Sequence, residues 1–147
     1  MSRRSKLLKI FVKNLGCIGE EGVAVELDDV VCLVGKNNSG KSTILRAYEL
    51  AHTPSRFNIE RDRCRWAADG VSSVVELDVH IPEGTGNVAE RWKVLTGDLL
   101  VVRSRWEWNA SGDAQRKTWD PELKAWAEDG KAGGLETVFK CLSCGSC

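Results

Sequence analysis

Residues 31–45 read VCLVGKNNSGKSTIL, and this stretch decides the fold class of the chain. Residues 30–34 are continuously apolar, a pattern typical of a strand that is covered on both faces of a sheet. A short polar loop follows, and apolar residues then recur at helical spacing from Ile44 to about His52. Pro54 is expected to end that helix. A strand, a glycine-rich loop and a helix in this order predict an α/β fold.

The loop between this strand and this helix matches the pattern G-x-x-x-x-G-K-[ST] of phosphate-binding (Walker A) loops at Gly35, Gly40, Lys41 and Ser42. The glycines let successive backbone N–H groups point at phosphate oxygens, and the helix aims its positive end at the same anion. Lys41 would supply charge to the β- and γ-phosphates, the Ser42 hydroxyl would bind Mg²⁺, and Thr43 would lie near the α-phosphate. Because these positions and their flanking strand and helix rarely coincide by chance, we favour a nucleoside triphosphate site over a glycine-rich turn without a ligand.

The rest of the chain contains several alternating apolar patterns. They predict strands over about residues 6–14, 23–27, 71–81 and 99–108, and the first two are expected to pair. Charged residues without a clear period predict a loop, with a short helix, over residues 55–70. A turn is expected at residues 109–113, and a short helix over residues 121–128 with Asp120 as its N-cap. These patterns predict a mixed, partly antiparallel sheet.

The stretch KLLKIFVKNLGCIGEEGVAVELDDVVCLVGKNNSGKSTILRAYELA resembles the start of the OLD/RecF/SMC group of ABC-type ATPases. In that group a strand with a lysine and an asparagine precedes a second strand and then a hydrophobic strand that ends in GxNNSGKST. The nearest resemblance is to OLD-like ATPases of the AAA family, often described as overcoming-lysogenization-defect endonucleases. The resemblance is specific over residues 6–52, and weaker over the strands expected at 71–81 and 99–108.

The resemblance implies a P-loop NTPase fold, with residues 1–139 forming a partial ABC-type head. The cysteine-rich residues 140–147 match no motif of the group and are expected to be a disordered tail. In this group ATP and Mg²⁺ bind between two heads that pack face to face, so a homodimer of heads is implied. Relatives often carry arginine where this chain has Gly16, which puts one cation contact to the nucleotide in question. The residues implied to contact ATP are Gly35, Asn37, Asn38, Ser39, Gly40, Lys41, Ser42 and Thr43, with Ser42 also on Mg²⁺.

The sequence lacks the other parts of an ATPase site that relatives possess. No apolar run ends in Asp-Glu, and no serine-glycine signature precedes a helix; Gln115, the one glutamine, lies in a turn-like stretch. Glu76 and Asp78 come nearest to the acidic residues, but their alternation with apolar residues predicts the polar face of a strand. We therefore expect an incomplete chain, the first lobe of a larger ATPase, and whether it hydrolyses ATP stays open. The alternative is a catalytically inactive, truncated fragment that acts only as a nucleotide-binding or interaction module.

Composition restricts the partners and the location. Lys and Arg number 21, as do Asp and Glu, so the formal net charge of zero gives no general attraction to nucleic acid or anionic membrane. The sequence starts with basic residues, and the apolar stretch that follows them is too short for a signal peptide or a membrane-spanning helix. We therefore expect a cytoplasmic protein. The resemblance alone suggests DNA repair or phage defence, with DNA reached through regions missing from this chain. A GTPase would need an Asn-Lys-x-Asp motif, which the sequence does not contain.

Two further groups of residues are interpreted as structural. Alternation along residues 103–108 is expected to bury Trp106 and Trp108 and expose the arginines, rather than form a nucleic-acid surface. His52 and His80 are isolated in the sequence and are expected on the solvated surface.

The last residues, CLSCGSC, have spacing suited to zinc or an iron–sulfur cluster, but they offer three thiolates where structural zinc takes four ligands. We favour a disordered chain end without metal.

Overall fold

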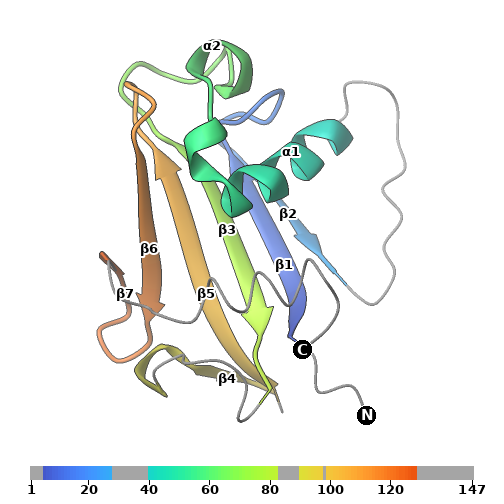
Figure 1. Cartoon of the computed structure of the whole chain (residues 1–147), viewed down its shortest axis with the longest axis vertical. Coiled ribbons are helices and arrows are strands. Elements are labelled where there is room, and N and C mark those ends of the chain that lie inside the picture. The colour runs from blue at the N-terminus through green and yellow to red at the C-terminus, as the bar shows by residue number, and fades with distance from the viewer. Residues whose placement is uncertain (1–4, 28–39, 83–89, 98, 129–147) are drawn as a thin grey trace. The chain divides into compact units, whose positions relative to one another are not determined.

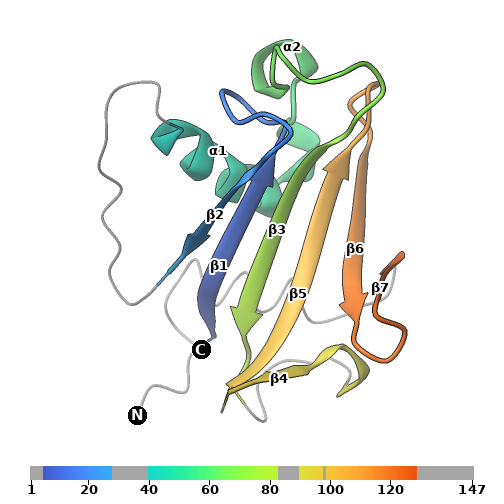
Figure 2. The same ribbon diagram turned by 180° about the vertical axis from the view of Figure 1, so that it is seen from behind.

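The computed structural model describes residues 5–27, 40–82, 90–97 and 99–128. Its strands form one sheet in the order β2-β1-β3-β5-β6-β7, with β4 paired to β5, and neighbouring arrows run in opposite directions (Figures 1 and 2). The described sheet is therefore antiparallel, and the strand predicted at residues 30–34 lies outside the described residues. In chain order the strands are β1 Lys6–Lys13, β2 Val23–Glu26, β3 Ser73–His80, β4 Val94–Thr96, β5 Leu99–Trp108, β6 Ala114–Asp120 and β7 Ala125–Glu128. The α-helices are α1 Lys41–His52 and α2 Ile59–Asp62, and 3-10 helices span Pro54–Arg56 and Glu90–Trp92.

The chain divides into two compact units. Both units contain residues of the strands β1, β3, β5 and β6. The helical unit comprises Lys9–Glu76 and Trp106–Gln115, and it contains α1 and α2. The hairpin unit comprises Met1–Leu8, Leu77–Arg105 and Arg116–Cys147, and it contains β4 and β7.

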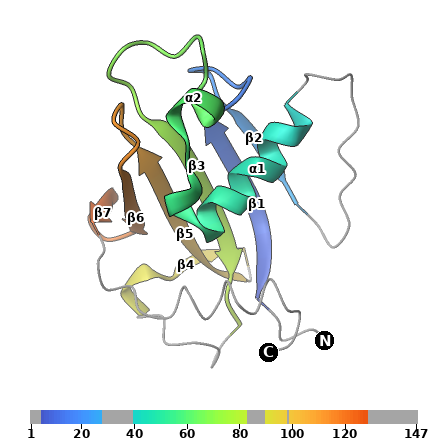
Figure 3. The same ribbon diagram turned by 45° about the horizontal axis from the view of Figure 1, so that its top comes forward.

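The helical unit contains the elements that the sequence predicts around the glycine-rich loop. β1 and β2 pair antiparallel, with Val12 opposite Val23, as expected. α1 lies against one face of the strands of this unit (Figure 3), and it ends before Pro54 as predicted. The side chains that α1 buries are Ile44, Ala47, Leu50 and Ala51, an apolar stripe at helical spacing.

Trp108 is the largest side chain that the core encloses completely, with no exposed surface. Its ring stacks on Phe57 at a centroid distance of 5.1 Å, and its indole N–H donates to the Pro54 carbonyl oxygen at 3.0 Å. Trp106 is also buried, so the predicted packing role of both tryptophans is confirmed.

The hairpin unit corrects the prediction for residues 121–128. No helix forms there: Ala125–Glu128 is the strand β7, which pairs antiparallel with β6 so that Trp119 lies opposite Trp126. Asp120 still caps backbone N–H groups, since its Oδ1 accepts from Glu122 at 3.0 Å and Leu123 at 3.1 Å, but these belong to a turn. The contact of the two indole rings, with centroids 5.4 Å apart, is a cross-strand interaction that favours the hairpin.

The arginines of β5 are less exposed than predicted. The Arg103 guanidinium lies 5.3 Å from the Trp119 ring centroid, and that of Arg105 lies 5.5 Å from the Trp126 centroid, distances that suit cation–π contacts. Both arginines are half-buried, and both therefore pack as well as carrying charge.

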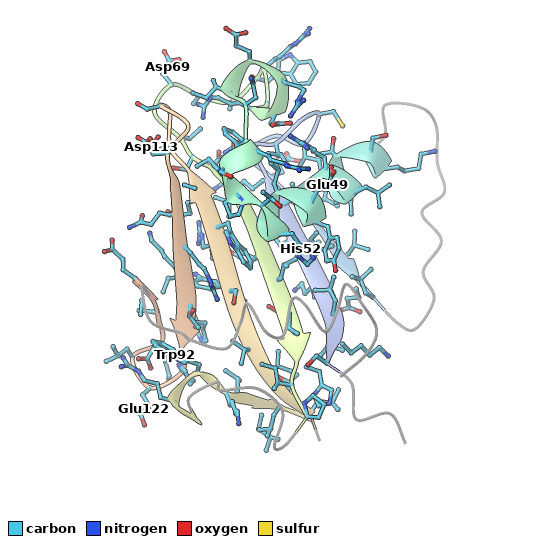
Figure 4. All side chains as sticks on the ribbon, viewed as in Figure 1. Glu49, His52, Asp69, Trp92, Asp113 and Glu122 are labelled. Carbon is cyan, nitrogen blue, oxygen red and sulfur yellow. The ribbon has the colours of Figure 1, made fainter. Side chains whose placement is uncertain are left out.

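The two histidines are also half-buried, which corrects their predicted place on the solvated surface. His52 meets the ring of Tyr48 edge-on at 4.6 Å, and burial lowers the pKa of its imidazole. The Nδ1 atom of His80 lies 2.9 Å from the Leu100 carbonyl oxygen. Figure 4 shows His52 and Glu49 on α1.

Candidate functional site

The first turn of α1 is where the structure places the described part of the predicted phosphate-binding loop. The helix begins at Lys41, directly after Gly40, whose φ of 96° is a left-handed conformation that suits glycine. The Ile44 amide donates to the Gly40 carbonyl oxygen at 2.9 Å, which closes the first turn. The predicted helix after the loop is confirmed, and it begins three residues before Ile44, where the apolar spacing starts.

This helix end has the charge distribution of an anion site. The first N–H groups of a helix have no acceptor within the helix, and they carry a partial positive charge. Gly40 has no side chain to cap them, and the first turn contains no acidic residue but does contain Lys41 and Ser42. A negatively charged ligand is what such an end would attract. The other predicted contacts, Gly35, Asn37, Asn38 and Ser39, lie outside the described residues.

The turn between β1 and β2 packs on this first helical turn at Gly16. Gly16 has a φ of 54°, and a Cβ added to it would lie 2.4 Å from the Thr43 hydroxyl oxygen. The side chain of Thr43 therefore occupies the space that any side chain at position 16 would need. The exposed Cys17 thiol lies beside it, with its sulfur 3.6 Å from the same Thr43 oxygen.

A buried ion pair lies next to this contact, and sequence reasoning missed it. Asp62 is only 4% exposed, and its carboxylate accepts from Arg46 Nε at 3.0 Å and Arg46 Nη2 at 3.2 Å. It also accepts from the Asn58 amide at 2.8 Å. The sequence signal was weak, because Asp62 is one of several charges in a stretch without a clear period.

Acid should weaken the helical unit through Asp62. Burial by itself raises the pKa of this carboxyl, but the bonds from Arg46, Asn58 and Arg61 outweigh it, so the pKa lies below its ordinary 3.8. A depressed pKa contributes stability above pH 3.8 that is lost as the pH falls through the folded value. We expect the urea midpoint of the wild type to fall more steeply than that of Asp62→Asn between about pH 5 and pH 2. Parallel midpoints would contradict this expectation.

Comparison with known protein families identifies the family of this chain from a match over more than half of its length. A profile described as an AAA ATPase domain matches residues 6–96. The chain belongs to the AAA ATPase domain family. This membership supports the predicted use of a nucleotide, with Mg²⁺ as its usual companion. No curated protein matches the chain. Within the residues that the structure describes, no helix is both long and apolar enough to cross a membrane.

Glu76 and Asp78, the carboxylates considered for catalysis, do not form part of a metal-binding group among the described residues. Among the described residues, no three His, Cys, Asp or Glu side chains are grouped so that they could hold a metal ion. Asp78 faces Arg103, with Oδ1 and Nε 3.3 Å apart, which supports the predicted structural role of the polar face of β3. The three terminal cysteines Cys141, Cys144 and Cys147 lie outside the described residues.

The helical unit also contains a cavity, which lies beside the turn of residues 109–113 and Gln115. The turn forms as predicted, with Asn109 Oδ1 accepting from the Ser111 amide at 2.9 Å and the Asp113 amide at 3.0 Å. Gln115 belongs to β6 and not to a turn. A cavity of about 350 Å³ here is lined by Ser72, Glu107, Asn109, Asp113, Ala114 and Gln115.

Proposed function

We propose that the chain is the ATP-binding first lobe of an OLD/RecF/SMC-like ATPase head. The observation that carries the proposal is the start of α1, where an uncapped helix end without acidic residues directly follows the sequence GKNNSG. Membership of the AAA ATPase domain family supports the same ligand.

The residues at the start of α1 have chemically distinct roles in this proposal. The backbone N–H groups of the first turn and of the loop from Gly35 bind phosphate oxygens, and the Lys41 ammonium neutralises the β- and γ-phosphates. The Ser42 hydroxyl is exposed and is an oxygen donor of the kind that Mg²⁺ prefers, so it fits as one ligand. Ser42 would be the residue of this turn that holds Mg²⁺, and the ion would supply positive charge that reduces the repulsion among the phosphate oxygens.

A second candidate is a module that binds nucleotide but does not hydrolyse it. The observation that favours it is the ion pair of Asp78 with Arg103, because a carboxylate held by an arginine is poorly placed to orient an attacking water. A steady-state ATPase measurement with the wild-type chain separates the two candidates. Turnover that disappears in Lys41→Ala would support an active ATPase.

Replacing Lys41 is the direct test of the nucleotide site. A charge-assisted bond to phosphate contributes about 1.5–3 kcal/mol, so Lys41→Ala should weaken ATP binding by about tenfold to 150-fold. Calorimetric titration with Mg·ATP measures the change, and titration with GTP checks the base preference. Lys124→Ala, which removes an exposed lysine from the turn before β7, is the matched control and should bind like the wild type. Equal affinities of wild type and Lys41→Ala would refute the assignment.

The setting of this activity is also part of the proposal and rests on the resemblance of residues 6–52. We place the protein in the cytoplasm, in DNA repair or phage defence, with two heads closing on ATP. Light scattering with and without Mg·ATP tests the dimer: an ATP-dependent doubling of mass is the expected result.

A further inference from the structure

Asp62 joins three parts of the helical unit through one residue. Its side chain accepts hydrogen bonds from Arg46 on α1, and it accepts one from the Asn58 amide at the start of α2. Its backbone carbonyl oxygen accepts from the Gly16 amide at 2.7 Å, in the turn between β1 and β2. A shift of Asp62 would therefore change the positions of both α1 and this turn.

Arg46 holds Asp62 with a geometry that lysine cannot reproduce. Nε and Nη2 bind the two carboxylate oxygens as a fork, at 3.0 and 3.2 Å, and Nη2 also donates to the Arg56 carbonyl oxygen at 3.2 Å. An ammonium offers a point charge instead of this planar set of donors. The third nitrogen, Nη1, reaches Glu49 at 3.2 Å, where the Glu49 side chain is 61% exposed.

The contact of Gly16 with Thr43 completes a closed path back to α1. Thr43 stands three residues before Arg46, so the two side chains lie on the same face of the helix. The path thus runs from Arg46 to Asp62, on to Gly16, and from there to Thr43 in the first turn of the helix. α2 has only four residues, too few for a helix that is stable by itself, so its place depends on these bonds.

We propose that the Arg46–Asp62 pair is a positioning element of the nucleotide site. The pair fixes the Gly16 amide and so presses the turn of residues 14–20 against Thr43, which sets the first helical turn where Lys41 and Ser42 are. Neither Arg46 nor Asp62 touches the nucleotide in this account. The inference rests on the proposed ATP site and extends it to residues outside the loop motif.

The experiment measures ATP affinity of the full chain with Arg46→Lys, which keeps a positive charge beside Asp62 and should fold. We expect affinity to fall by about threefold to thirtyfold, the range found for residues that act through neighbours. Near-ultraviolet circular dichroism checks that the fold is kept. Arg65→Lys is the matched control in the same segment, and its exposed side chain should leave ATP affinity unchanged. Arg46→Gln, which keeps one donor toward Asp62, provides a second measurement if the lysine variant does not fold.

A double-mutant cycle separates positioning from general stability. Thr43→Ala removes both the hydroxyl and the methyl group that face Gly16, and its effect on ATP affinity should be smaller in the Arg46→Lys background than in the wild type. Additive effects, or an Arg46→Lys variant that binds ATP like the wild type, would overturn the positioning role alone. A wild-type chain that binds no ATP would overturn the proposed function, and the positioning role with it.

Discussion

Trp108→Ala should cost the chain about 3–5 kcal/mol of unfolding free energy, the usual range for removing a buried tryptophan. Its ring is fully buried and stacked on Phe57, so the substitution leaves a cavity in the helical unit. It also removes the donor of the Pro54 carbonyl oxygen. Because whole domains are stable by only about 5–15 kcal/mol, the urea midpoint should fall markedly.

Trp66→Ala is the matched control for this substitution. Trp66 is 78% exposed, so the same chemical change should alter the unfolding free energy by no more than about 0.5 kcal/mol. Comparable losses in the two variants would contradict the assignment of Trp108 to the core. The comparison is possible because the chain contains tryptophans at both extremes of burial.

The predictable parts of the fold are single helices and strands whose apolar residues follow a regular spacing along the sequence. Alternation along β3 and β5 reports a sheet with one buried face, and spacing from Ile44 to Ala51 reports a helix with one buried stripe. The start of α1 was predictable for the same reason, since a loop motif fixes it locally. The helix that carries Lys41 was therefore predictable from sequence, whereas the role of Lys41 in binding phosphate stays a prediction.

The parts that were missed depend on contacts between different elements, which the pattern within one element does not show. Asp120 followed by Pro121 is a valid start for a helix, but the pairing of Trp119 with Trp126 favours a hairpin instead. Propensity is a weak prior that such tertiary contacts override. Asp62 gave no local sign of its burial, because its pairing with Arg46 depends on how α2 folds back on α1.

Gly16 differs from the arginine expected from the OLD/RecF/SMC resemblance, and the structure gives a physical reason for a glycine at this position. From sequence, a glycine in place of arginine looked like the loss of a contact to the nucleotide. In the structure the turn approaches α1 so closely that Thr43 fills the space where a side chain would begin. The glycine is therefore required by the packing of the turn on the helix, whatever the nucleotide does.

Gly16→Ala should accordingly damage both stability and ATP binding. A left-handed residue costs alanine about 1–2 kcal/mol, and crowding in a packed site adds about 1–3 kcal/mol. Since the added Cβ would lie 2.4 Å from the Thr43 oxygen, the turn or the first turn of α1 must move.

Gly70→Ala separates these two costs. Gly70 has a φ of 82°, but a Cβ there would meet nothing within 4 Å, so only the backbone cost of about 1–2 kcal/mol is expected, with ATP affinity unchanged. Urea unfolding and Mg·ATP titration of both variants give the comparison. If Gly16→Ala loses no more stability than Gly70→Ala and still binds ATP like the wild type, the turn does not press on the nucleotide site. If it loses more stability and also loses ATP affinity, the contact between Gly16 and Thr43 is what places the start of α1.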